Sequence, residues 1–162
     1  MGIKCAKVVG LVETPAGSTD KLEFNRKKGE FVVKRKFPNG LSCPGNYGEI
    51  EGTLAEDGAA LDFLCVRGAP AKPGDRLRMK VIGIARFNDE KGRDDKLICV
   101  PMDCEISSLN DLSEEERNAA LNFFPNSKKG LPGKYGVLDG VDDAEAARTK
   151  IAACIDRYKK KD

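Results

Sequence analysis

The sequence predicts a mainly β fold of the α+β class, in which a small closed β-barrel carries two helices near its C-terminus. The first two thirds of the 162 residues consist of short strand patterns separated by Gly and Pro. The last third carries two helical patterns, and strands do not alternate with helices as they do in a parallel α/β sheet. Because this length suits one ordinary domain, we expect residues 1–162 to form a single domain.

Seven strands are expected from the alternation of apolar and polar residues between turn signals. The clearest lies within residues 76–87, where Leu77 and Met79 alternate with Arg78 and Lys80. Half-buried strands have this pattern because successive side chains point to opposite faces. The predicted strands are Ala6–Glu13, Leu22–Asn25, Glu30–Lys36, Tyr47–Leu54, Ala60–Val66, Arg76–Phe87 and Asp95–Val100.

Two helices are expected in the last third of the chain. Ser113, with Glu116 three residues later, forms a capping box that predicts the first helix start, and Pro125 predicts its end. The second helix is expected over Asp142–Tyr158, because its apolar residues share one face and its first residues are acidic. Both helices would pack an apolar face against the strands.

Composition excludes several classes of function. Lys and Arg total 28 while Asp and Glu total 26, and a formal net charge of +2 argues against a nucleic-acid binder. The chain has no histidine, which rules out histidine-based triads and His-ligated zinc. No apolar run approaches the roughly 18 residues of a membrane span, so none is expected.

The six cysteines indicate a reducing environment. They show no C-x-x-C spacing, and Cys65, Cys99 and Cys154 lie inside apolar runs. A free cysteine in such a run behaves as a small hydrophobic residue, so we expect buried, reduced thiols. The expected location is therefore a reducing compartment, either the cytoplasm or the interior of an organelle.

Acidic residues bracket two predicted turns. Asp57 and Asp62 flank a turn that enters a strand, and Asp89 and Asp94 flank a predicted hairpin loop. Asp residues around a Gly turn are more often turn formers than metal ligands. Several carboxylates together are nevertheless the ligand set that Mg²⁺ or Mn²⁺ prefers. The pairs alone do not decide between these interpretations.

A series of short segments over roughly Val8–Tyr158 decides between them. The segments are Val12-Glu13-Thr14-Pro15, Lys21-Leu22-Glu23-Phe24, Arg35, Pro44-Gly45-Asn46-Tyr47-Gly48, Asp57–Asp62, Pro73-Gly74-Asp75, Val81-Ile82-Gly83, Asp89–Lys96, Val100-Pro101, Asn110-Asp111-Leu112, Phe123-Phe124, Lys128, Gly133-Lys134 and Ala144-Glu145-Ala146-Ala147. Their order and spacing resemble the compact bacterial and organellar type of soluble (family I) inorganic pyrophosphatase. The resemblance implies an OB-like barrel and hydrolysis of pyrophosphate to two phosphates with a divalent metal.

The resemblance also implies a role for each group of site residues. It assigns Mg²⁺, or alternatively Mn²⁺, to a set of carboxylates: Asp57, Asp62, Asp89, Asp94 and Glu13, with Glu23 at the border of the site. It assigns the phosphate oxygens to Lys21, Arg35, Tyr47, Lys96, Lys128 and Lys134, and it counts Tyr47 among the catalytic residues as well. This division is physically consistent, because pyrophosphate carries several negative charges and needs both divalent cations and fixed cationic donors.

The chain departs from the family pattern at the chemistry itself. The family signature reads Asp, a small or polar residue, Asp, Pro or Glu, an aliphatic residue, and Asp. Here Ala59 stands at the middle Asp, which in the family orients and deprotonates the attacking water. Ser127 and Glu49 also stand where the family has tyrosines. Three carboxylates remain as alternative bases: Glu49, Glu51 and Glu56.

Two functions from different classes follow. A positioned general base contributes about 10²- to 10⁴-fold, so a site that still binds metal is expected to hydrolyse pyrophosphate at a reduced rate. Its partners would be pyrophosphate, phosphate and further copies of the chain, since the resemblance implies a homo-oligomer. The alternative is a catalytically inactive subunit with a structural or binding role in a larger protein assembly, because fold does not guarantee function.

Overall fold

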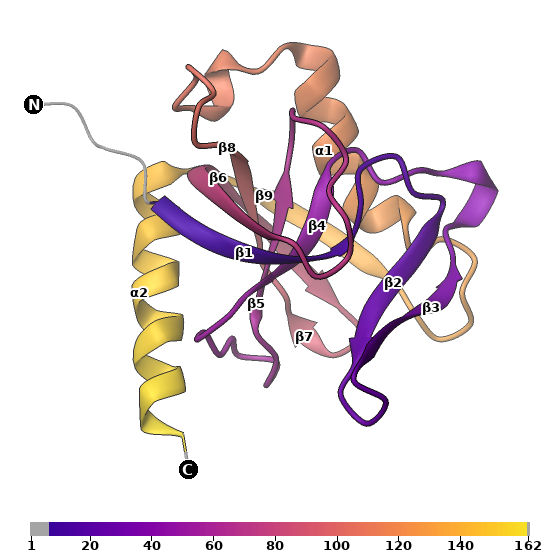
Figure 1. Cartoon of the computed structure of the whole chain (residues 1–162). Helices are drawn as coiled ribbons and strands as arrows, with labels where there is room; N and C mark the ends of the chain where they lie inside the picture. The colour runs from indigo at the N-terminus through magenta and orange to yellow at the C-terminus, as the bar shows by residue number, and fades with distance from the viewer. Residues whose placement is uncertain (1–6, 162) are drawn as a thin grey trace, which may run out of the picture.

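The structure is a computed structural model that describes residues 7–161, and it consists mainly of strands, with two helices in the last third of the chain (Figure 1). The helices are α1 (Glu114–Asn126) and α2 (Ala144–Lys160), and two short 3₁₀ turns are η1 (Pro38–Gly40) and η2 (Leu109–Asp111). The strands are β1 (Lys7–Thr14), β2 (Asp20–Asn25), β3 (Glu30–Lys36), β4 (Asn46–Ile50), β5 (Leu61–Cys65), β6 (Arg76–Asp89), β7 (Gly92–Arg93), β8 (Lys96–Pro101) and β9 (Gly136–Asp143). The mainly β class with two helices in the last third is confirmed.

Five strands form a ring of hydrogen-bonded pairs. β1 pairs with β4, β4 with β5, β5 with β8 and β8 with β6, and β6 returns to pair with β1. The β5–β8 pair is parallel and the other pairs of the ring are antiparallel. β7 and β9 extend β6, while β2 and β3 form a separate hairpin at one side of the ring (Figure 1).

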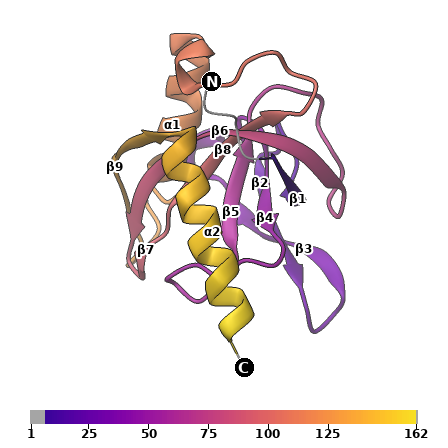
Figure 2. The same ribbon diagram turned by 90° about the vertical axis from the view of Figure 1, so that its left-hand side faces the viewer.

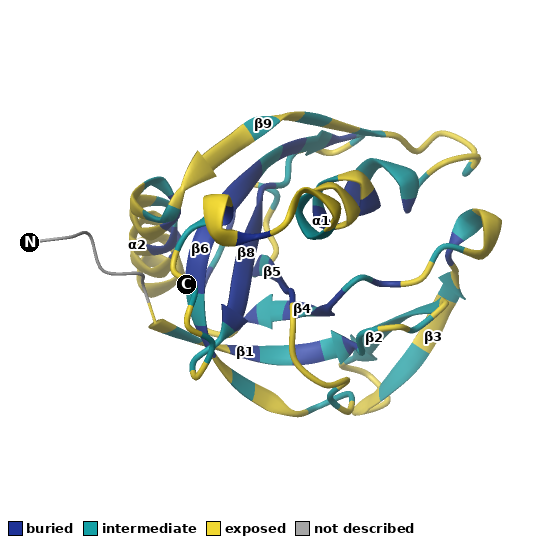
Figure 3. Ribbon diagram, turned by 90° about the horizontal axis from the view of Figure 1, so that it is seen from above, coloured by how far each residue is buried: buried dark blue, intermediate teal, exposed yellow. Residues whose placement is uncertain are grey.

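The two helices cover different parts of this ring. Phe123 and Phe124 of α1 belong to one buried apolar cluster, and Ile151 and Cys154 of α2 belong to another. Figure 2 shows α2 lying across the outside of the strands. The strands β5, β6 and β8 are the most buried, whereas β9 and the outer face of α2 remain exposed (Figure 3). Both helices therefore pack against the strands through the apolar faces that were expected from the sequence.

The start of α1 is confirmed and its end is corrected. The Ser113 hydroxyl accepts a hydrogen bond from the Glu116 N–H (3.1 Å), and the Glu116 carboxylate accepts one from the Ser113 N–H (3.0 Å). Pro125 does not end the helix, which continues to Asn126. A proline in the last turn removes one N–H donor, and the following Ser127 N–H still reaches the Phe123 carbonyl (2.8 Å).

Other predicted boundaries also needed correction. β4 ends at Ile50 rather than Leu54, because the chain turns at Gly52, whose φ of 80° favours glycine. β9 was not expected, and the predicted helix start at Asp142 is wrong. Asp142 lies in β9 and Asp143 caps α2. Ala6, the first residue of one predicted strand, lies outside the described residues.

A close approach of β4 to β1 fixes the backbone beside one predicted site residue. A Cβ atom on Gly48 would lie only 1.8 Å from the Leu11 carbonyl oxygen, so only glycine fits there. The preceding Tyr47 is thereby held next to β1 as well as β5.

The expectation of buried free thiols is confirmed for Cys65, Cys99 and Cys154. Cys43 is also buried and free, Cys104 is half-buried and free, and Cys5 lies outside the described residues. Between residues 7 and 161, no helix is long and apolar enough to cross a membrane.

Candidate active site

One cavity of about 420 Å³ brings all of the predicted site residues together. Its walls come from the strand ring, the β2–β3 hairpin and the loops that follow α1 and β6. The predicted residues in its lining are Glu13 on β1, Lys21 and Glu23 on β2, Arg35 on β3, Tyr47 on β4, Asp57 and Ala59 before β5, Asp62 on β5, Asp89 on β6, Asp94 before β8, Lys96 on β8, and Lys128 and Lys134 between α1 and β9. The fold therefore gathers residues that are widely separated in sequence.

Lys96 lies at the centre of the charged groups. Its Nζ is 2.7 Å from Asp62 Oδ2, 3.0 Å from Asp94 Oδ2 and 2.8 Å from the Tyr47 hydroxyl oxygen. The side chain is only 8% exposed. Burial alone would lower the pKa of the ammonium, but Asp62, Tyr47 and Asp94 hold that pKa well above its usual value. Lys96 is therefore a permanently charged group between two carboxylates.

The sheet register explains this arrangement. Asp62 and Lys96 are paired residues of the parallel β5–β8 ladder, so their side chains lie side by side. Asp94 precedes Lys96 by two residues and lines the same cavity, as alternation along an extended chain requires. Tyr47, on the neighbouring strand β4, donates its hydroxyl hydrogen to Asp62 Oδ2 over 3.0 Å. Three adjacent extended segments thus supply the group.

Three carboxyl groups in the cavity have raised pKa values, and two of them, Asp94 and Glu13, are shifted strongly. Burial, together with the carboxylates of Asp62 and Asp57, raises the pKa of Asp94 to about 6 against the pull of Lys96. Burial raises the pKa of Glu13 to about 7, and nearby carboxylates add to the effect although the Phe24 N–H opposes it. Burial is the main cause of both shifts, because it disfavours the charged form of a carboxyl group, and the neighbouring carboxylates act in the same direction.

The donor chemistry fits a hard divalent cation. Within residues 7–161, no three acidic, histidine or cysteine side chains are grouped closely enough to hold a metal ion as they stand. Lysines contact the carboxylates instead, since Lys128 Nζ lies 3.1 Å from Asp89 Oδ2 and Lys96 joins Asp62 to Asp94. Crowded carboxylate oxygens without histidine suit Mg²⁺ or Mn²⁺ better than zinc. The individual metal ligands remain predictions.

The predicted phosphate-binding side chains of Arg35 and Lys21 have polar partners of their own within the cavity. The guanidinium of Arg35 donates to the Ser127 carbonyl (2.8 Å), and Lys21 Nζ lies 3.5 Å from Glu23 Oε1. Burial lowers the pKa of the Lys21 ammonium. The Ser127 hydroxyl donates to the Phe124 carbonyl (2.8 Å), so it is engaged with the helix end rather than directed to a ligand.

Glu90 is a cavity residue that the sequence analysis missed. Its carboxylate lies 3.3 Å from Lys128 Nζ and 3.8 Å from Lys134 Nζ, and it accepts the Tyr135 N–H (3.2 Å). It thereby connects the loop after α1 to the end of β6. Its position directly after Asp89 was the available signal, but a single acidic residue in a turn does not reveal such long-range partners.

The three alternative bases differ in where they lie. Glu51 pairs with Arg76 (2.8 Å) and Glu56 pairs with Lys150, and neither lines the cavity. Glu49 does line it, at the position on β4 that pairs with Asp62 of β5. Burial raises the pKa of Glu49 although the Arg26 guanidinium opposes this. Of these three carboxylates, Glu49 alone faces the same space as Ala59.

Comparison with known proteins decides the relationship. The family model described as inorganic pyrophosphatase matches residues 10–159. This chain belongs to the inorganic pyrophosphatase family. It is 37% identical to the inorganic pyrophosphatase of Sulfolobus acidocaldarius over 91% of this chain and 88% of that protein. It is also 36% identical to the Halalkalibacterium halodurans inorganic pyrophosphatase over 98% of this chain and 99% of that one.

Solved pyrophosphatase structures have the same arrangement of strands and helices. The crystal structure of the Thermus thermophilus inorganic pyrophosphatase superposes with a TM-score of 0.89 at 34% identity, covering 94% of this chain and 91% of that one. The Coxiella burnetii inorganic pyrophosphatase superposes with a TM-score of 0.87 at 34% identity, covering 97% and 98% of the two chains. Fold and sequence therefore agree on family membership.

Replacement of the central ammonium should destabilise the protein unless another cation is supplied. In Lys96→Met, Asp62 and Asp94 lose their shared partner while still partly buried, and we expect a loss of about 3–5 kcal/mol in unfolding free energy without metal. Added Mg²⁺ should restore part of it. Denaturant unfolding with and without Mg²⁺ measures both effects. Lys72→Met is the control, because Lys72 is exposed and lies outside the cavity. Equal losses of unfolding free energy and an equal response to Mg²⁺ in the two variants would contradict this account.

The raised carboxyl pKa values also predict a pH dependence of the metal-free protein. The pKa values of Glu13 and Asp94 rise from ordinary values of 4.5 and 3.8 to about 7 and about 6 on folding. Between pH 5 and pH 7 the folded state therefore binds more protons than the unfolded state, and its stability should fall as pH rises. Urea unfolding in a chelator tests this, and Glu13→Gln should flatten the slope. A stability that rises over this window would refute it.

Proposed function

We propose that this chain is a divalent-metal-dependent inorganic pyrophosphatase that hydrolyses pyrophosphate to two phosphates, more slowly than it would with an aspartate in place of Ala59. The observation that carries the proposal is the single cavity lined by every residue that the family resemblance assigns to metal or phosphate. We further propose that residues 1–162 are one domain whose strand ring is an OB-like barrel. Mg²⁺ is the proposed metal, with Mn²⁺ as a substitute.

The proposed division of labour follows the charges. Asp57, Asp62, Asp89, Asp94 and Glu13 would hold the metal, which supplies charge neutralisation and lowers the pKa of water. Lysine and arginine side chains around the cavity bind the phosphate oxygens, with the planar guanidinium of Arg35 suited to two oxygens at once. Lys96 holds Asp62 and Asp94 in place, and the Tyr47 hydroxyl supports Asp62 from the neighbouring strand.

The proton balance requires an acceptor that Ala59 cannot supply. As the water oxygen bonds to one phosphorus, the bridging phosphorus–oxygen bond breaks and the second phosphate leaves. The water proton then goes to a base or to bulk water. We propose Glu49 as that acceptor, supported by its position in the cavity opposite Asp62 and by the burial that raises its pKa.

Restoring the missing carboxylate should raise activity. Ala59→Asp should increase phosphate release from pyrophosphate by about 10²-fold, because the other charged groups are already in the cavity. Glu49→Gln should slow the unsubstituted protein and have little effect when it is combined with Ala59→Asp. Glu51→Gln is the matched control, because Glu51 pairs with Arg76 outside the cavity.

Two outcomes would contradict these assignments. Equal rates for Glu49→Gln and Glu51→Gln would remove Glu49 from the reaction. No turnover in the native chain and no gain in Ala59→Asp would favour the alternative, a catalytically inactive subunit of a larger assembly.

We also propose that the protein forms a homo-oligomer in a reducing compartment. Tyr135, Val137 and Val141 are exposed apolar residues on and just before β9, and exposed apolar surface of this kind favours association. Light scattering on the native protein distinguishes a closed oligomer of this chain from a monomer, and stoichiometric recovery with other proteins would instead support the inactive-subunit alternative.

A further inference from the structure

A buried acidic residue anchors the segment that carries Asp94. The side chain of the next residue, Asp95, is 1% exposed and does not line the cavity. Its carboxylate accepts hydrogen bonds from the Phe87 N–H (3.0 Å), from Arg93 (3.0 Å) and from Arg86 (3.1 Å). Because consecutive residues of an extended chain point in opposite directions, Asp95 fixes from behind the backbone that presents Asp94 to the cavity.

The segment that carries Asp57 is anchored in a similar way. The Leu54 N–H donates to the Cys154 carbonyl of α2 (3.0 Å), and Arg157 of α2 donates to the Leu54 carbonyl (2.8 Å). The Ala55 N–H donates to the Ala59 carbonyl (2.7 Å), which closes the turn around Asp57. The base of this turn is therefore fastened to α2.

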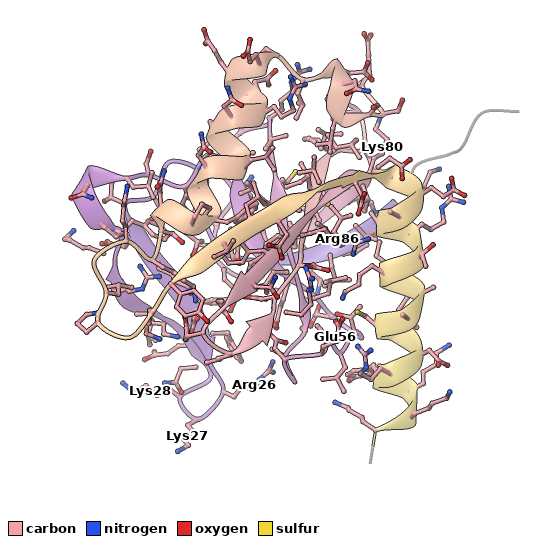
Figure 4. All side chains as sticks on the ribbon, turned by 180° about the vertical axis from the view of Figure 1, so that it is seen from behind. Arg26, Lys27, Lys28, Glu56, Lys80 and Arg86 are labelled. Carbon is pink, nitrogen blue, oxygen red and sulfur yellow. The ribbon has the colours of Figure 1, made fainter. Side chains whose placement is uncertain are left out.

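A single ammonium joins the two anchors. Lys150 Nζ on α2 hydrogen-bonds the Glu56 carboxylate and lies 3.4 Å from Asp95 Oδ2, and the Lys150 side chain is only 11% exposed. Figure 4 shows Arg86 and Glu56 on the side of the strand ring that faces α2. Glu56 directly precedes Asp57 and Asp95 directly follows Asp94, so Lys150 connects the neighbours of two predicted metal ligands.

We propose that Lys150 is a positioning residue for the divalent-cation site, because it sets the spacing between Asp57 and Asp94 by holding Glu56 and Asp95 together. This inference rests on the proposed function. It extends the site to the C-terminal helix, which contributes no residue to the cavity lining. Partners that orient metal ligands typically change metal affinity by about 10- to 100-fold when they are removed.

The sign of the effect separates positioning from simple charge. Removing a cation near a divalent metal would strengthen metal binding if Lys150 acted only through its field, since like charges repel. Loss of positioning weakens metal binding instead. A purely structural role would lower the stability of the metal-free protein and leave the metal affinity unchanged.

The test is a calorimetric titration of Mg²⁺ into the 162-residue chain and three variants. Lys150→Met keeps the aliphatic length without the charge, and we expect its Mg²⁺ dissociation constant to rise about 10-fold. Lys150→Arg keeps both ion pairs and should bind nearly as well as the native protein. Lys159→Met is the control, because Lys159 is an exposed residue of the same helix, and it should leave the dissociation constant unchanged.

The variants are expected to fold, because Asp95 keeps three other donors in Lys150→Met. Should Lys150→Met prove unstable, Lys150→Gln also removes the charge while keeping a polar side chain that is too short to join Glu56 to Asp95, and it should also weaken Mg²⁺ binding. Unchanged or tighter binding in the Lys150→Met and Lys150→Gln variants, or equal weakening in Lys159→Met, would overturn the inference. If the native protein binds no Mg²⁺, the proposed metal site is overturned together with this inference. If the native protein binds Mg²⁺ and hydrolyses pyrophosphate while the Lys150 variants bind Mg²⁺ equally well, only this inference is overturned.

Discussion

The pairing of Lys96 with Asp62 and Asp94 is the interaction around which the cavity is built. The parallel register of β5 and β8 places Asp62 beside Lys96, and the extended chain before β8 brings Asp94 to the same side. Carboxylates at such short separation are stable in a partly buried site only when a cation lies between them. The other predicted site residues line the same cavity, so this strand pairing positions a central group of the proposed metal and phosphate site.

The departures from the family signature leave this framework intact. Ala59 lies in an exposed turn, where its N–H donates to Asp57 Oδ1 (3.0 Å) and its carbonyl closes the turn with Ala55. A side chain can be lost from such a turn without moving the strands that carry Asp62 and Lys96. The charged groups of the cavity are therefore in place while position 59 carries no carboxylate, which is the basis for proposing reduced hydrolysis instead of none.

Local signals predicted much of the fold and site, and long-range contacts supplied the rest. The alternation of apolar and polar residues predicted β3 with its observed bounds, and the capping box predicted the start of α1. The segments that resemble the family predicted residues that line one cavity. β9 was missed because its order depends on pairing with β6, a partner about fifty residues earlier in the chain. Glu90 and Lys150 were missed for the same reason, since their importance lies in partners that the sequence does not place nearby.

The most direct test of the central claim is phosphate release from pyrophosphate by the native chain, measured with Mg²⁺ and again with chelator. Asp94→Asn protein purified in parallel measures any contaminating activity. Asp94 lies 3.0 Å from Lys96 in the cavity, so its amide should disrupt the site without removing the fold. The account predicts release that requires Mg²⁺ and is lost in the variant. Release that is absent, independent of Mg²⁺ or equal in the variant would contradict it.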